Sequence, residues 1–118
     1  MDVSFREEEG VIIVDMQGRL VSGGPAESLR QLINQLLVED RGRVLLNLSE
    51  VGWIDSSGIG ELVSGIKRAE ASGCSIKLLR VGDRVRHVLS ISRLLPLLEV
   101  FEDEDEAIES FEDSGQDE

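Results

Sequence analysis

The sequence predicts an α/β fold, with a mixed, mostly parallel sheet of four to five strands, an N-terminal hairpin and helices packed against the sheet. Short apolar runs typical of buried strands alternate with segments in which apolar residues recur at helical spacing. Residues 11–16 and a shorter strand around Phe5, joined by a turn at Glu9-Gly10, predict the antiparallel hairpin. The length of 118 residues fits one domain, and right-handed crossovers would set the positions of the helices.

The first helix follows this hairpin. Pro25 suits its first turn, where a missing N–H costs nothing, and Gly42 is expected at its C-terminal end. Its apolar face is formed by Leu29, Leu32, Ile33, Leu36 and Leu37. Residues 43–48 then predict a buried strand, and we expect a loop from there through Trp53.

Two further helices and two further strands are expected in the second half of the chain. A helix begins near Ser57 and ends before Gly73, with an apolar face of Ile59, Leu62, Val63, Ile66 and Ala69. Residues 76–81 predict the next buried strand, and residues 98–101 a last, short one. Between them, a shorter helix that stops near Pro96 is outlined by Val85, Val88 and Leu89.

The C-terminal segment combines three apolar residues with many acidic ones. Ala107, Ile108 and Phe111 lie at helical spacing, so a terminal helix is expected to dock through these three side chains. Residues 112–118 contain no apolar side chain and are expected to be disordered. The sequence therefore predicts a domain over residues 1–111 and an acidic tail over residues 112–118.

The distribution of charge restricts the classes of partner. Residues 1–98 carry 12 basic and 13 acidic side chains, whereas residues 99–118 carry 11 acidic side chains and no basic one. A near-neutral body with an acidic end argues against nucleic acid or an anionic membrane as partner. No apolar run approaches the roughly 18 residues of a membrane span. One cysteine and no signal peptide fit a cytoplasmic protein.

Few residues are candidates for catalysis. His87 is the only histidine, so a histidine metal cluster is excluded, and a lone histidine on a helix is usually a surface or packing residue. Cys74 is expected to be a small buried residue. The glycines lack the spacing of a phosphate-binding loop. We therefore expect no enzyme, no metal and no cofactor.

Residues 54–60, Ile-Asp-Ser-Ser-Gly-Ile-Gly, are the exception, because they lie where a strand and loop give way to a helix. In the structural interpretation Asp55, Ser56 or Ser57 caps that helix. Gly58 and Gly60 in its first turn are then unexpected, since each costs up to about 1 kcal/mol relative to alanine. Glycine has a use where a strand, a partner protein or a phosphoryl group approaches the backbone closely.

In the functional interpretation a serine at this helix start is phosphorylated. A helix N-terminus carries about half a positive charge and several unpaired N–H donors, so a phosphate would be held there. The phosphate adds roughly −1.5 to −2 charge, which a protein docked on this surface would sense. Local physics alone leaves both interpretations open and favours the cap.

Residues 51–60, following the strand at residues 44–48, resemble the STAS domain family and especially bacterial anti-sigma factor antagonists. The resemblance extends through Phe111 and includes the hairpin, the Leu-rich first helix, the strand at residues 76–81 and the helix after it. The order Asp-Ser-Ser-Gly-Ile-Gly between strand and helix is fairly specific. The family often carries an acidic or polar residue after the second strand, where residues 19–25 of this chain read Arg-Leu-Val-Ser-Gly-Gly-Pro, a departure that bears on partner choice more than on fold.

The resemblance implies a partner-switching function. The unphosphorylated antagonist binds an anti-sigma factor that is also a serine kinase, phosphorylation with ATP releases it, and a serine phosphatase restores it. The phosphoacceptor would be Ser56, with Ser57 as the alternative. The expected partner-binding residues are Ser22, Gly23, Gly24, Asp55, Ser56, Ser57, Gly58, Ile59 and Gly60.

Two other functions are open at this point. The chain could be a STAS scaffold that is never phosphorylated, as a subunit of a signalling or transporter-associated complex. It could also be an enzyme or a small-ligand sensor with a pocket beside Ser56, which would need a base close to that hydroxyl. A phosphate on Ser56 in protein from its own cells would select the switch over the scaffold.

Overall fold

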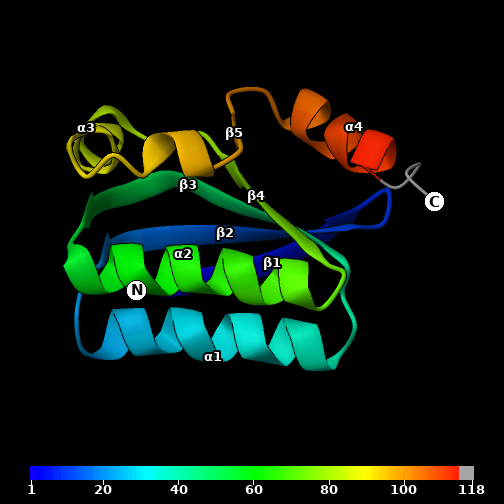
Figure 1. The fold of residues 1–118 in the computed structure, drawn as a ribbon, viewed down its shortest axis with the longest axis horizontal. Helices are drawn as coiled ribbons and strands as arrows, with labels where there is room; N and C mark the ends of the chain where they lie inside the picture. The colour runs from blue at the N-terminus through cyan, green and yellow to red at the C-terminus, as the bar shows by residue number, and fades with distance from the viewer. Residues whose placement is uncertain (115–118) are drawn as a thin grey trace.

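The fold is organised around one five-stranded sheet with strand order β1-β2-β3-β4-β5 (Figure 1). The computed structural model describes residues 1–114. The strands are β1 (Asp2–Glu8), β2 (Val11–Leu20), β3 (Arg43–Ile54), β4 (Ser75–Leu79) and β5 (Val100–Phe101). The helices are α1 (Gly24–Val38), α2 (Ser56–Ala71), α3 (Asp83–Ile91), the short 3-10 helix η1 (Leu95–Leu97) and α4 (Glu104–Ser114).

Strand directions confirm the predicted mixed sheet. β1 and β2 are antiparallel, and the pairs β2–β3, β3–β4 and β4–β5 are parallel. The hairpin turn contains Glu9 at φ 52° and Gly10 at φ 82°. Positive φ at both central residues is typical of the two-residue turn whose twist matches that of paired strands.

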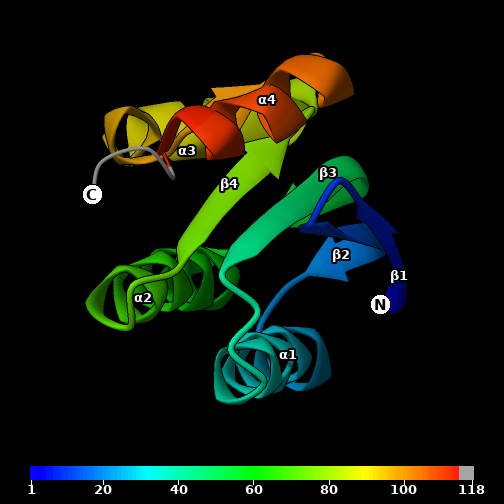
Figure 2. The same ribbon diagram turned by 90° about the vertical axis from the view of Figure 1, so that its right-hand side faces the viewer.

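Helices cover both faces of the sheet. α1 and α2 lie side by side on one face, and α4 lies on the other (Figures 1 and 2). The larger core cluster joins α1 and α2 to sheet residues such as Val14, Leu46 and Leu78, and it includes Val85 and Leu89 of α3. Alternate residues of the same strands meet α4 in a second cluster, as expected from the two-residue period of a strand.

Non-glycine residues in the left-handed region end three elements, which moves their boundaries from the predicted positions. Asp40 (φ 58°) follows the end of α1, so this position is not taken by Gly42 as predicted. Arg80 (φ 54°) follows β4, which therefore ends at Leu79. Arg93 (φ 60°) lies just beyond α3. Left-handed φ is uncommon outside glycine, so sequence pattern gives little warning of it.

β3 is longer than predicted, because the segment expected to be a loop through Trp53 continues as strand to Ile54. β2 is extended to Leu20 and pairs with it, with register shifts between Asp15 and Gln17 and between Gly18 and Arg19. These bulges interrupt strict alternation, which is the pattern that identifies a strand in sequence. The two strands thus reach the beginnings of α1 and α2 together.

α4 docks through the three predicted side chains. Ala107, Ile108 and Phe111 are all buried, against Ile13, Leu45 and other sheet residues. The helix continues to Ser114, so the first three residues of the predicted disordered tail are helical. The rest of that predicted tail, residues 115–118, lies outside the described residues.

A polar cluster ties α4 to the hairpin. The Arg6 guanidinium donates to the Asp15 carboxylate at 2.7 and 3.1 Å and to the Glu104 carboxylate at 2.8 Å through two nitrogens. The Asn47 amide donates to Asp15 at 2.7 Å. Hydrogen bonds from Arg6 are the main cause that lowers the pKa of both Asp15 and Glu104. These partners of Asp15 are far apart in sequence, so no local pattern indicates them.

Candidate functional site

The predicted site residues lie where β2 and β3 end and α1 and α2 begin. Both helices start at the same end of the sheet, on the left in Figure 1. In parallel strands the carboxyl ends share one edge, where the following loops meet. The residues after Leu20 and after Ile54 are therefore brought together, although they are far apart in sequence.

Asp55 holds these two segments together. It is the N-cap of α2, and its Oδ1 accepts a hydrogen bond from the Gly58 backbone N–H at 3.0 Å. Its Oδ2 accepts from the Ser22 backbone N–H at 2.9 Å, and its own N–H donates to the Leu20 carbonyl oxygen at 3.2 Å. The capping interpretation is therefore confirmed for Asp55, which also connects α2 to the loop before α1.

The same hydrogen bonds lower the pKa of Asp55. The Gly58 N–H is the largest cause and the Ser22 N–H the next, because both donate to the charged carboxylate. Since both oxygens are engaged by backbone donors, this carboxylate is poorly placed to act as a base toward a neighbouring hydroxyl. The geometry assigns it a structural role.

Ser56 and Ser57 are the first two residues of α2, and both are exposed. Within residues 1–114, neither hydroxyl makes a hydrogen bond to another side chain or to the backbone, so both are accessible to a modifying enzyme. The positive end of the helix dipole lies at these residues. A negatively charged group attached here would be stabilised by the helix.

The two unexpected glycines have different surroundings. Gly58 is buried, and a Cβ there would clash with the Leu20 carbonyl oxygen, so the close approach of β2 requires glycine. Gly60 is exposed, and a Cβ there would have no neighbour within 4 Å. The packing of the chain thus explains Gly58 and leaves Gly60 without an internal reason.

Some of the remaining predicted partner-binding residues are exposed at the surface, and others are buried beneath it. Ser22, Gly23 and Gly24 are exposed, and Gly23, the N-cap of α1, has φ +91°, which favours glycine. Ile59 is buried like Gly58, so these two support the surface from below. The exposed part of the site thus consists of the loop before α1, the two serines and Gly60.

Two residues beside this surface were missed by sequence reasoning. Trp53 is 36% exposed at the end of β3, and it pairs in register with the exposed Arg19 at the end of β2. Tryptophan and arginine are enriched among residues that dominate binding at protein interfaces. A tryptophan two residues before Asp55 was the available signal, but its segment was predicted to be a loop and not a strand.

The other candidates have the expected surroundings. His87 is exposed on α3, and Cys74 is buried, which raises the pKa of its thiol. Among the described residues no three His, Cys, Asp or Glu side chains are grouped to hold a metal ion. In that same part of the chain no helix has the length and apolarity to cross a membrane.

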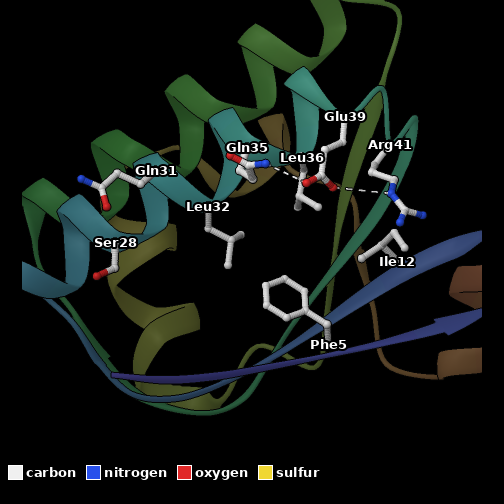
Figure 3. A pocket seen from close by; sticks show the side chains of 9 residues that line it. All are labelled: Phe5, Ile12, Ser28, Gln31, Leu32, Gln35, Leu36, Glu39 and Arg41. Carbon is white, nitrogen blue, oxygen red and sulfur yellow. Dashed lines mark hydrogen bonds and ion pairs between the residues drawn. The ribbon is translucent and has the colours of Figure 1, made fainter.

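A hollow of about 630 Å³ lies between β1 and α1. Figure 3 shows the Phe5 ring facing Leu32 across it, with Glu39 bound by Gln35 and Arg41 at one end. The hollow shares no residue with the site at the start of α2. It therefore supplies no base beside Ser56.

Comparison with known proteins gives matches over most of the chain. A family model described as the STAS domain matches residues 2–107. A protein of Thermotoga neapolitana, named as a candidate anti-sigma factor antagonist and homologue of TM1081, is 31% identical over 78 residues. The alignment covers 66% of this chain and 69% of that protein.

Solved structures show the same fold. The crystal structure of TM1081 of Thermotoga maritima, a candidate anti-sigma factor antagonist, gives a TM-score of 0.83 at 24% identity, covering 92% of each chain. The phosphorylated form of the Bacillus protein SpoIIAA gives 0.70 at 21% identity, over 93% of this chain and 99% of that one. Its unphosphorylated form, named an anti-sigma factor antagonist, gives 0.69 at 17% identity, over 94% and 98%. The family match over residues 2–107, with a relative at 31% identity, shows that the chain belongs to the STAS domain family.

Proposed function

We propose that this chain is an anti-sigma factor antagonist that binds an anti-sigma factor and is released when Ser56 is phosphorylated. The observation that carries the proposal is the exposed Ser56 hydroxyl at the N-terminus of α2, which makes no hydrogen bond within residues 1–114 and lies beside a loop that Asp55 holds in place. The relatives named as candidate antagonists, and a relative known in a phosphorylated form, support this function.

The anti-sigma factor acts as the serine kinase in this scheme. The Ser56 Oγ forms a bond to the γ-phosphorus of ATP, the bond from that phosphorus to the bridging oxygen breaks, and ADP leaves. The proton of the hydroxyl passes to a base of the kinase. This chain contributes the acceptor hydroxyl and a helix N-terminus that tolerates the product, and a serine phosphatase returns Ser56 to its free form.

Release follows from charge placed inside the contact surface. The phosphate brings roughly −1.5 to −2 charge to a surface that the partner covers when Ser56 is unmodified. Burying this charge against the partner without a matching cation is unfavourable. Because the helix N-terminus accommodates the phosphate, the fold is kept while the complex is weakened.

Phosphorylation of matched variants tests the site. The anti-sigma factors of the same genome, supplied with ATP, should add one phosphate to the wild-type chain and to Ser57→Ala, and none to Ser56→Ala, as measured by intact mass. A phosphate on Ser56→Ala but not on Ser57→Ala would assign the role to Ser57. Absence of phosphate from the wild type with every such kinase would contradict the proposal.

Binding of a charged variant tests the switch. Ser56→Asp should bind the anti-sigma factor at least about tenfold more weakly than the wild type in calorimetric titration, a loss of about 1.4 kcal/mol. Ser56→Ala, which adds no charge, is the control and should keep its affinity. Equal affinity of Ser56→Asp and the wild type would show that the partner does not cover this helix start.

A further inference from the structure

A groove of about 580 Å³ runs along one side of α2. It begins at Ile59 and Gly60, directly beside the two serines, and reaches Ala71 at the end of the helix. Leu94, which precedes η1, forms the opposite wall. At 1.5 Å per residue these positions extend over roughly 18 Å, which matches a short peptide segment. The groove is thus continuous with the proposed switch surface.

The floor of the groove includes the glycine that internal packing does not explain. A Cβ on Gly60 would point into open space, and Gly60 lies in the first turn of a helix, where glycine is unfavourable. The same glycine lines the groove. A second chain that approaches the backbone closely here would explain why residue 60 is glycine, which contacts within the domain do not explain.

The walls of the groove carry positive charge without a matching negative charge. Its lining contains Lys67 and Arg68 and no carboxylate, although the net charge of the chain is −12. Within residues 1–114 neither cation forms an ion pair. Arg68 donates from Nη1 to the Ser64 hydroxyl at 2.7 Å, while its Nε and Nη2 are buried without an acceptor. Lys67 is exposed, so an incoming carboxylate can pair with its ammonium group.

Apolar side chains complete the lining and indicate what the occupant needs besides charge. Ile59, Val63, Ala71 and Leu94 contribute apolar surface to the groove. Just beyond Leu94, Leu97 is 61% exposed, and Ile91 at the end of α3 is 67% exposed. Apolar positions beside unpaired cations fit a segment that carries both apolar and acidic side chains.

We propose that the anti-sigma factor, while bound at Ser56, lays an acidic and partly apolar segment along this groove, with a carboxylate at Lys67. This inference rests on the proposed function and names the chemistry of the partner's docking segment. Binding energy from the groove keeps the kinase on its substrate, while the charge at Ser56 decides release.

Charge reversal at Lys67 tests the groove against a matched control. Lys67→Glu should weaken binding of the anti-sigma factor at least tenfold in calorimetric titration. Arg41→Glu makes the same change of charge outside the groove and should keep the affinity within about twofold. Rising salt should weaken the binding of the wild type more than the binding of Lys67→Glu. Salt screens the proposed ion pair at Lys67, and the variant lacks that pair.

Filling the floor of the groove gives a second, uncharged test. Gly60→Leu introduces a side chain into open space, so its thermal unfolding temperature should remain at or above that of the wild type, while its affinity for the anti-sigma factor falls at least tenfold.

If Lys67→Glu and Gly60→Leu both bind normally while Ser56→Asp is released, the groove proposal is wrong and the proposed function stands. If the wild type binds no anti-sigma factor of its genome, both the groove proposal and the proposed function are wrong. If the variants instead abolish self-association seen in sedimentation, the occupant is a second copy, which also overturns the proposal.

Discussion

At the residue scale, Asp55 connects segments 33 residues apart through the Ser22 N–H while it caps α2 through the Gly58 N–H. The proposed acceptor Ser56 is the next residue. The position of Ser56 therefore depends on a neighbour whose two carboxylate oxygens both accept hydrogen bonds from backbone N–H groups. A single carboxylate thus sets both the start of the helix and the position of the loop beside it.

Replacing Asp55 should show its structural role through a pH dependence. Its folded pKa lies below the usual value, so its contribution to stability is present above the unfolded pKa of about 4 and is lost as pH falls through the folded value. Asp55→Ala should unfold at lower urea than the wild type at pH 7, and the two midpoints should converge as pH falls below 4. A difference that is constant with pH would contradict this role.

The glycine pair offers a controlled comparison at the same helix start. Gly58→Ala should destabilise the fold by about 2 kcal/mol or more, because the new Cβ meets backbone at Leu20 that cannot move freely. Gly60→Ala should be neutral or stabilise by up to about 1 kcal/mol, because its Cβ meets open space and alanine favours helix. Chemical unfolding of the two variants measures the difference directly. If Gly58→Ala were as stable as Gly60→Ala, helix propensity and not the contact with β2 would be decisive.

At the scale of elements, α4 is attached by one polar and one apolar contact region. Arg6 bridges Asp15 on β2 and Glu104 on α4, and Phe111 is 1% exposed against the sheet. Buried Lys77 of β4 lies 4.6 Å from the Phe111 ring and donates to the Ser110 carbonyl at 3.1 Å. The polar region contains two carboxylates and the apolar cluster contains none, so we expect the two regions to respond differently to pH.

Acid should weaken only the polar attachment of α4. The pKa of Asp15 and of Glu104 is lowered by Arg6, so their contribution is present above about pH 4 and lost as pH falls through the folded values. Arg6→Gln should cost about 1 kcal/mol at pH 7 and progressively less below pH 4. Phe111→Ala should cost about 3–5 kcal/mol at both pH values. Urea unfolding at the two pH values measures both, and an Arg6→Gln cost that does not change with pH would contradict the ion-pair role.

Among the elements, the sequence predicted those features that depend on the spacing of apolar residues and on turn residues. The hairpin, the faces of α1 and α2, and the three contacts of α4 follow from apolar spacing that local residues determine. The extended end of β3 was missed, because its register shifts remove the alternation that marks a strand. The helix and strand ends at Asp40, Arg80 and Arg93 were missed, because residues other than glycine adopt left-handed φ there.

At the scale of the molecule, the sequence could place the candidate serine but not its surroundings. The order Asp-Ser-Ser-Gly before a helix predicted the cap from local rules, and the family resemblance implied Ser56 as the acceptor. The contact of Ser22 with Asp55, the clash that requires Gly58, and the pairing of Arg19 with Trp53 arise only when β2 and β3 lie side by side. Such contacts depend on the tertiary arrangement, which a single sequence does not show.

Helices cover both faces of the sheet, so removal of α4 should lower the stability of the whole fold. A chain ending at Asp103 would expose Ile13, Leu45 and Leu79, which α4 covers. It should lose its cooperative thermal transition or aggregate, because an apolar sheet face is left in water. A chain ending at Ser114 retains every described residue and should unfold as the full chain does. A cooperative transition at the same temperature in the shorter chain would show that α4 is dispensable.

Trp53 also gives the protein an optical property. The chain contains one tryptophan and no tyrosine, so its indole fluorescence reports a single position, two residues before Asp55. Because this ring is partly exposed at the end of β3, a protein that covers the site would remove water from it and shift its emission to shorter wavelength. With a partner that contains no tryptophan, the proposed binding at the start of α2 and release from it should therefore be measurable in real time on the unlabelled chain.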